Sequence, residues 1–365
     1  MDSSTKHGHN IYTTCRTLPT FNSLSDENLK LAINASIETY LPDLQIFDHG
    51  LPAHFHRKSE AAWLEFTCVT VHVCNLLSNS CLSRRQATAM MRHIDLLYRV
   101  DDFMETLIDA YGIQDISLAF EALQRCFQPY LGSSSALGSK RSRHARRRID
   151  SPVEGVAPIA NPIELEQDLK DVVERMHGYP ISEASEQDRQ WYSLELYDFL
   201  VAQLEQLDSE IPKTVIPGQL HKWVTNVGAR SVGTNYMFAM FKCLVSAEEG
   251  GESLWKMASS LYMAQEFAQQ ISVEFRVLND VGGRVRDLRD GTMSSCTLVS
   301  EGECTELLKI AESAAERSAM LLCELVQGSD ADDGRKMRDL LEMFRRSVRV
   351  SGEICMAGEP NRGAS

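Results

Sequence analysis

Two clusters of oxygen-bearing side chains stand out from the apolar helical patterns of this 365-residue chain. In the stretch RVDDFMET, residues 99–106, Asp101 and Glu105 are four residues apart and Asp102 follows the first. Residues four apart lie on one face of a helix, so these carboxylates repel each other unless a cation neutralises them. The preceding HIDLLYRV is mostly apolar, which indicates that this face points inward. The cluster predicts a cation site, with an ordinary salt-bridged acidic turn as the alternative.

The second cluster is VLNDVGGRVRDLRDG, residues 277–291, in which Asn279, Gly283 and Asp287 follow one helical stripe at i, i+4 and i+8. The two glycines at 282 and 283 cost about 1 kcal/mol each inside a helix. Such glycines favour a place where something approaches the backbone closely. The same turns carry Arg284, Arg286 and Arg289. We expect carboxylates that hold a metal and arginines that hold an anion bridging it, with a surface charge ladder as the alternative.

Together the clusters indicate a specific chemistry. Mg²⁺ prefers hard oxygen ligands and is usually held by a few carboxylates plus substrate phosphates. A diphosphate held by Mg²⁺ between two acidic helices, and by arginine side chains, becomes a good leaving group. Its departure leaves a carbocation, which survives only in a dry, apolar cavity lined by aromatic rings. The sequence therefore predicts metal-dependent ionisation of a diphosphate ester.

The elements that must position these residues are helices. Strand signals are nearly absent, helix-period patterns fill most of the chain, and Ser25 of SDEN is a plausible N-terminal cap. Short connections without internal repeats predict one all-α domain, 25–357, between an N-terminal extension, 1–24, and a tail, 358–365. The expected helices are approximately 25–40, 57–79, 84–111, 115–130, 163–177, 185–209, 218–247, 253–287, 302–327 and 333–356.

One segment, residues 131–162, departs from the helical pattern. It begins Gly/Ser-rich and then becomes basic, with six Lys or Arg residues between Lys140 and Arg148. This composition predicts a flexible, solvated insertion, with room for a lid edge that attracts an anionic substrate. A nuclear-localisation or nucleic-acid role is the alternative that the basic run leaves open.

The composition argues against a nucleic-acid-binding, membrane-spanning or secreted protein. The net charge of −14 does not favour nucleic acid as a partner. No apolar stretch reaches 18 residues, so no transmembrane helix or stable membrane insertion is expected, and the N-terminus lacks the apolar region of a secretory signal. The ten cysteines include no CxxC or CxxH pair, which is typical of reduced, buried thiols. We expect a cytoplasmic protein.

The motifs carry a resemblance to a known family. DDFME resembles the aspartate-rich motif of class I terpene synthases, and NDVGGRVRD is similar to their second metal motif, NDxx(S/T)xx(K/R)E. The match covers Asn279, Asp280, Arg286 and Asp287, with Asp for the usual Glu and Gly283 for the usual Ser or Thr. The resemblance implies an all-α, single-domain helical bundle around a central apolar cavity. The two motifs would face each other across its mouth.

The resemblance also assigns metal ligands. Three Mg²⁺ ions are expected with bound diphosphate. Asp101 would bridge two of them with Glu105 as a weaker ligand, and Asn279 and Asp287 would hold the third.

Three further motif positions would support those ligands. Asp102 would accept a hydrogen bond from an arginine, and Asp280 belongs to the second motif without a direct ligand role. Gly283 has no side-chain oxygen, so a water or the diphosphate would take its place at the metal.

Three arginines would contact the diphosphate. Arg286 occupies the basic position of the second motif. Arg230, in GARSVGTNYMF, matches a diphosphate-sensing arginine on a helix that breaks, and Gly228 and Gly233 are consistent with such a break. Arg349, in RRSVRVSGE, matches the arginine of a C-terminal Arg-Tyr pair in which a valine replaces the tyrosine here.

The cavity wall is the least specific prediction, because Met and Phe at helical spacing also suit an ordinary core. The candidates lie beside the motifs and the expected helix break: Tyr98, Phe275, Thr234, Met237 and Phe238.

Three functions stay in competition. A chain-elongating prenyl diphosphate synthase shares the metal chemistry but carries a second DDxxD where this chain has NDVGGRVRD, which favours cyclisation. A non-catalytic helical protein that binds a partner through its basic loop is the third reading. Among cyclases the chain looks similar to divergent fungal sesquiterpene cyclases, in particular the humulene-forming enzymes of tropolone meroterpenoid pathways. That similarity implies Mg²⁺-dependent cyclisation of farnesyl diphosphate to α-humulene with release of diphosphate.

Overall fold

The computed structural model describes residues 11–48, 62–111, 116–131, 162–207, 219–253, 255–290, 293–327 and 331–357. Within these ranges the chain forms helices and their connections, and no strand. The all-α prediction is confirmed. The basic stretch 132–161 and the tail 358–365 lie outside the described residues, so the predictions made for them stay predictions.

The expected helices have counterparts in the structure, with most ends within a few residues of the predicted ones. After a short helix over 11–17 come η1 (Pro19–Phe21), α2 (Asp26–Asp48), α3 (Ala62–Leu77), α4 (Arg84–Tyr111), α5 (Ser117–Leu131), α6 (Pro162–Met176), η4 (Ile181–Glu183), α7 (Glu186–Leu207), α8 (Gln219–Trp223), the π-helix η5 (Val224–Gly228), α9 (Ala229–Ser231), α10 (Thr234–Glu248), α11 (Ala258–Asp290), α12 (Ser295–Leu298), α13 (Glu301–Gln327) and α14 (Ala331–Ala357). The backbone N–H of Asn28 donates to Ser25 Oγ over 3.3 Å, which confirms the predicted cap of α2.

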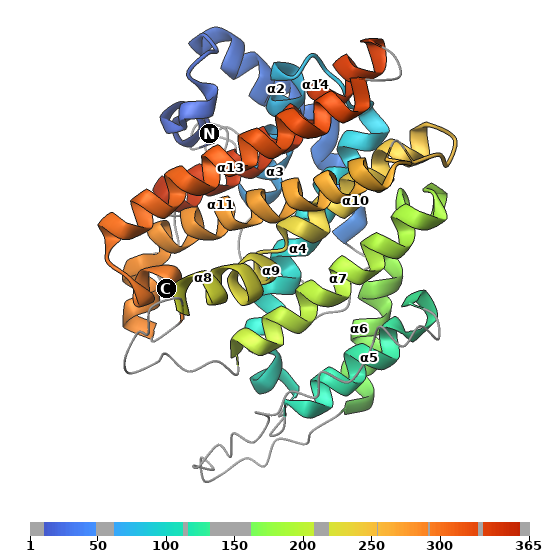
Figure 1. Ribbon diagram of the computed structural model, residues 1–365, viewed down its shortest axis with the longest axis vertical. Helices are drawn as coiled ribbons and strands as arrows, with labels where there is room; N and C mark the ends of the chain where they lie inside the picture. The colour runs from blue at the N-terminus through green and yellow to red at the C-terminus, as the bar shows by residue number, and fades with distance from the viewer. Residues whose placement is uncertain are drawn as a thin grey trace.

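The long helices form two groups around a central one. Helices α11, α13 and α14 pack against one another along one side, and α5, α6 and α7 pack together on another (Figure 1). Helix α4 contacts α2 and α3 as well as α6 and α7. Helix α10 packs against α4, α7, α11 and α14. It therefore lies at the centre of the bundle.

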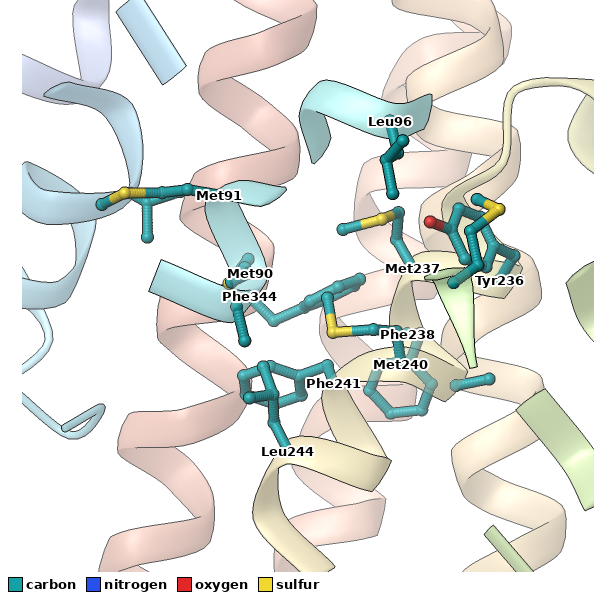
Figure 2. Packing of buried hydrophobic residues seen from close by; sticks show 14 of the residues in the cluster. Met90, Met91, Leu96, Tyr236, Met237, Phe238, Met240, Phe241, Leu244 and Phe344 are labelled. Carbon is teal, nitrogen blue, oxygen red and sulfur yellow. The ribbon is translucent and has the colours of Figure 1, made fainter. Parts of the chain in front are cut away.

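The sequence of α10 explains its place. Twelve of its 15 residues are buried, so it has no polar face to give to solvent. Figure 2 shows Met237, Met240 and Phe241 of α10 among side chains of α4 and α14, including Met90 and Phe344. A helix with apolar residues on every side is stable only when other elements surround it, and the charge of buried Lys242 is paired with Asp188.

Residues 11–24, which the sequence analysis places in an N-terminal extension, pack into the same core. Cys15, Leu18 and Phe21 are buried. Thr20 Oγ1 donates to Glu353 Oε1 over 2.9 Å, which ties this segment to α14. The described part of the extension thus belongs to the helical bundle.

Candidate active site

The first motif lies in the second half of α4. Val100, Phe103 and Met104 point into the core, while Asp101 is half-buried. The Asp101 carboxylate accepts a hydrogen bond from Gln203 of α7, with 2.7 Å between Nε2 and Oδ1. The side chains of Asp102 and Glu105 lie outside the described set, so their roles stay predictions.

The helix expected over 218–247 breaks, as Gly228 and Gly233 predicted. It divides into α8, a π-helical turn, α9 and α10. Gly233 has a φ of +71°, and a Cβ there would lie 2.4 Å from Leu97 Cδ1 of α4. A left-handed residue pressed against a neighbouring side chain must be glycine, because any other residue adds both strain and a clash. The break places the short helix α9 between the packed surfaces of α7 and α11.

Arg230 of α9 is held by two carboxylates of α7. Its Nε and Nη2 donate to Asp198 over 2.5 Å each, and Nη1 donates to Glu205 Oε2 over 2.9 Å. Partial burial opposes the charge, but the hydrogen bonds and charges of Asp198 and Glu205 outweigh it and raise the pKa of Arg230. Arg230 therefore stays positively charged beside the helix break.

These two partners of Arg230 were not predicted from the sequence. Asp198 and Glu205 are seven residues apart, which puts both on one face of α7. That spacing was visible in the sequence. What it could not indicate is that α9 would pack against this face, since the pairing joins segments 25 to 32 residues apart.

The second motif lies on α11, which continues unbroken through both glycines to Asp290. Asp280 is fully buried and pairs with Arg276, and its Oδ2 accepts the backbone N–H of Ser295 over 2.7 Å. Asp287 is only 4% exposed, and Asn279 and Gly283 are half-buried. Asp280 therefore holds α12 against α11, and the predicted ligand positions lie on the neighbouring face.

The face of α11 that carries Asn279 reaches the helix break. Ser272 lies seven residues before Asn279, two turns along the same face. Its Oγ donates to Oδ1 of Asn235 over 2.7 Å, and Asn235 is in the first turn of α10. The second motif is thus aligned with the start of α10, just after the break.

The two consecutive glycines have separate surroundings. A Cβ on Gly282 would lie 2.1 Å from the carbonyl oxygen of Cys355, so α14 backbone occupies the space beside it. The close approach expected at these glycines is therefore made, at Gly282, by a neighbouring helix. Gly283 keeps its predicted place on the ligand stripe.

The structure does not bring Arg349 to that stripe. Its guanidinium faces Glu274, Glu312 and Glu353 at 3.8, 3.0 and 3.5 Å. Glu274 lies five residues before Asn279, about 140° around α11 at 100° per residue. Arg349 thus bridges the α11, α13 and α14 group. The side chain of Arg286 lies outside the described set, and its role stays a prediction.

The proposed cavity residues fall into two classes. Phe238 has no exposed surface, and its ring is surrounded by Trp191, Phe241, Trp255, Phe267 and Phe344 at centroid distances of 5.2–6.4 Å. Its surroundings are those of a core residue. The others are less enclosed by aromatic rings: Thr234 and Met237 are buried after the break, and Phe275 is half-buried. The ring of Tyr98 is tilted against that of Trp63, with 5.3 Å between the ring centroids.

The donor set suits the predicted metal. Asp101, Asn279 and Asp287 offer carboxylate and amide oxygens, the hard ligands that Mg²⁺ prefers. Among the described side chains no three His, Cys, Asp or Glu residues gather closely enough to hold an ion. Asp102 and Glu105, whose side chains were not described, belong to the predicted set.

One further feature agrees with the sequence expectations. All ten cysteines are free thiols, and eight are buried. No helix in the described ranges has both the length and the apolarity that crossing a bilayer requires.

Comparison with known proteins gives an independent line of evidence. No protein-family model matches the chain. It is 23% identical over 376 aligned residues to a pimaradiene synthase of Emericella nidulans, covering 92% of this chain and 38% of the relative. It is 30% identical over 149 residues to an ent-kaur-16-ene synthase of Phaeosphaeria sp., covering 40% of this chain and 15% of the relative. The chain thus spans well under half of either relative. It is similar to the pimaradiene synthase over nearly all of its own length and to the ent-kaur-16-ene synthase over 40% of it.

Proposed function

We propose that this chain is a class I terpene cyclase, which ionises a prenyl diphosphate and closes the resulting cation into a ring. One observation carries the proposal. The two oxygen-rich motifs lie on α4 and α11, which both pack against segments of the broken helix that carries Arg230, in a chain similar along 92% of its length to a pimaradiene synthase.

The proposed reaction begins at the diphosphate. Bound Mg²⁺ supplies charge neutralisation and polarises the phosphate oxygens, so that the bond between carbon 1 and oxygen breaks more easily. Asp101, Glu105, Asn279 and Asp287 would hold these ions. The bonding electron pair leaves with the diphosphate, and an allylic cation stays behind.

Arg230 is suited to receive the leaving group. Its guanidinium is preoriented by Asp198 and Glu205, and side chains with 46% and 38% exposure can exchange partners with little desolvation. A diphosphate would compete with Asp198 for the same parallel N–H groups, because guanidinium forks match carboxylates and phosphates equally well. Arg286 would add a second donor.

Ring closure follows from the cation. A distal double bond attacks carbon 1, forming a carbon–carbon bond and moving the positive charge along the chain. Loss of a proton to the retained diphosphate then gives a neutral cyclic hydrocarbon. The apolar side chains beside the motifs, including Met237, would exclude water from the cation.

The substrate chain length separates two versions of the proposal. The general resemblance of the chain to divergent fungal sesquiterpene cyclases implies farnesyl diphosphate and α-humulene. Both relatives are named for diterpene products, which favours geranylgeranyl diphosphate. We rank geranylgeranyl diphosphate first, because the alignment covers nearly the whole chain whereas the motifs themselves do not depend on chain length.

The test is incubation of the purified protein with geranyl, farnesyl and geranylgeranyl diphosphates, with Mg²⁺ or with EDTA, followed by gas chromatography and mass spectrometry. A Mg²⁺-dependent cyclic hydrocarbon supports a cyclase and identifies the substrate. A longer diphosphate that forms only with added isopentenyl diphosphate would replace cyclisation by chain elongation. No product under any condition would contradict both activities.

A further inference from the structure

Gln203 of α7 links the first motif to the helix break. It is 7% exposed, and its Nε2 donates to two oxygens at once. One is Asp101 Oδ1, at 2.7 Å, and the other is the backbone carbonyl of Ser231, at 2.6 Å. Ser231 is the residue after Arg230 and ends α9. A single buried amide thus contacts α4 and the segment that presents Arg230.

Chemistry determines which way this amide points. Both partners are oxygens that only accept hydrogen bonds: a carboxylate and a backbone carbonyl. A carboxamide NH₂ has two hydrogens and can satisfy both together, whereas its oxygen would be repelled by both. The NH₂ group must therefore face Asp101 and Ser231. A glutamate or a leucine at position 203 could not take its place at neutral pH.

The helix break explains why Ser231 needs such a partner. In a continuous helix the carbonyl of Ser231 would accept the amide of residue 235. The left-handed Gly233 interrupts that ladder, and the carbonyls at the end of α9 need other donors. Gln203 supplies one from the side, as a cap would. This bond, together with the contacts of Arg230 to Asp198 and Glu205, connects α9 to α7.

We propose that Gln203 is a positioning residue that holds the Asp101 carboxylate in register with the Arg230 segment, so that Mg²⁺ and diphosphate are bound as one unit. This inference rests on the proposed function. It assigns to Gln203 a role that neither motif contains. Residues that orient a metal ligand without touching the metal typically change metal affinity 10- to 100-fold when replaced.

The first experiment measures binding without turnover. Titration of the full chain with Mg²⁺ and inorganic diphosphate, followed by calorimetry, gives the affinity of the parent and of Gln203→Leu. We expect a roughly 10- to 100-fold weaker affinity in the variant. Hydrogen exchange over residues 224–234 gives the second readout. Mg²⁺ with diphosphate should protect this segment in the parent and protect it much less in Gln203→Leu.

Gln190 provides the matched control. It is on the same helix, and its Nε2 also donates to a carboxylate, Glu186 Oε1, at 3.2 Å on the exposed surface. Gln190→Leu should bind Mg²⁺ and diphosphate as the parent does. Thermal unfolding of all variants reports whether a change in affinity merely follows a loss of folded protein.

Gln203→Glu keeps the size of the side chain but replaces its hydrogen-bond donor, so it distinguishes the loss of the hydrogen bonds from a loss of packing. At neutral pH its carboxylate would face the Asp101 carboxylate, and binding should weaken more than in Gln203→Leu.

The outcomes are distinct. A parent that binds Mg²⁺ with diphosphate, together with weakened and uncoupled Gln203 variants, supports the inference. A parent that binds, with Gln203→Leu showing the same affinity and the same protection of 224–234, overturns the inference and leaves the proposed function standing. A parent that shows no response to Mg²⁺ and diphosphate overturns both.

Discussion

The two motif-bearing helices are fixed in the bundle by different physical means. On the α4 side, polar side chains make the connections: Gln203 joins Asp101 to Ser231, and Asp198 and Glu205 hold Arg230. On the α11 side, close backbone packing adds to the polar contacts of Asp280 and Ser272. At Gly282 the carbonyl of Cys355 from α14 comes so close that no side chain fits between the helices.

Because of this difference, the regions around the two motifs should differ in how easily they rearrange when substrate binds. The ion pairs of Arg230 with Asp198 and Glu205 are partly exposed and can exchange partners at low cost, so the segment that carries Arg230 can rearrange when a charged substrate arrives. Helices packed backbone to backbone move only as rigid bodies. The second motif would then form the fixed wall of the site, and the first motif with the broken helix its adjustable wall.

The largest expected effect is on the adjustable side. Asp101→Ala removes the predicted bridging ligand and should lower turnover of the preferred prenyl diphosphate by about 10²–10³-fold or more, with little change in the free energy of unfolding. Steady-state kinetics at saturating Mg²⁺ measure it. Asp171→Ala is the matched control, since Asp171 also accepts a 2.7 Å bond from a glutamine amide, on the exposed surface of α6. Undiminished activity in Asp101→Ala would disprove the metal assignment.

The packing of α11, which carries the second motif, against α14 is tested by measuring the free energy of unfolding. Gly282→Ala places a methyl group where the Cys355 carbonyl lies, and α11 and α14 must separate. We expect a loss of about 3 kcal/mol in the free energy of unfolding, measured by urea denaturation. Gly302→Ala on α13 is the control, because nothing lies within 4 Å of a Cβ there. It should stabilise the chain by about 0.5 kcal/mol. Equal effects at the two glycines would contradict the close helix contact.

Acid should lower the free energy of unfolding, and the first helices to open should be those around His93 and His177. Burial lowers the pKa of His93 on α4 to about 3, and burial lowers that of His177, just after α6, to about 4. The unfolded chain binds these protons near pH 6.5 and the folded chain does not, so stability is complete above pH about 6.5 and lost as the pH falls toward 4. The expected loss at pH 5 is about 2 kcal/mol for each residue.

Urea denaturation at pH 7 and pH 5 measures this loss, and hydrogen exchange locates it. His177→Gln should reduce the pH dependence, while exposed His221→Gln should leave it unchanged. A parent equally stable at both pH values would show that these histidines take up protons without unfolding.

The smallest expected effect concerns the one motif position without an oxygen. Gly283→Ser restores the hydroxyl that the second metal motif usually carries, on a half-buried position of the fixed wall. Turnover should stay within a few-fold of the parent or rise, and the Mg²⁺ concentration for half-maximal activity should fall. Complete loss of activity would mean that a close approach to the Gly283 backbone matters more than the missing ligand.

Much of the fold was predictable because helix periodicity is local. The predicted helix over 84–111 coincides with α4, and 163–177 and 302–327 lie within one residue of α6 and α13. The break near Gly228 and Gly233 was also predictable, since glycines inside an apolar helix are costly unless the backbone needs them. Less predictable was the place of residues 11–24, whose sequence gives no sign of the core that receives Phe21.

The candidate site divides in the same way. The order and spacing of Asp101, Asn279, Asp287 and Arg230 are properties of the sequence, because residue type and register decide which side chains share a helical face. Whether Phe238 meets a cavity or a cluster of rings depends on four side chains from other parts of the chain, in addition to Phe241 of the same helix. The sequence could not distinguish these surroundings.

The sequence by itself determined the helical class, the two motifs, the arginine beside the break and the similarity to fungal terpene synthases. Only the tertiary structure decided that Gln203 bridges Asp101 and Ser231, residues 102 and 28 positions away from it, and that Gly282 meets the backbone of α14. The physical reason is that periodicity specifies which face of a helix is buried. Which neighbour covers that face follows from the packing of all the helices together.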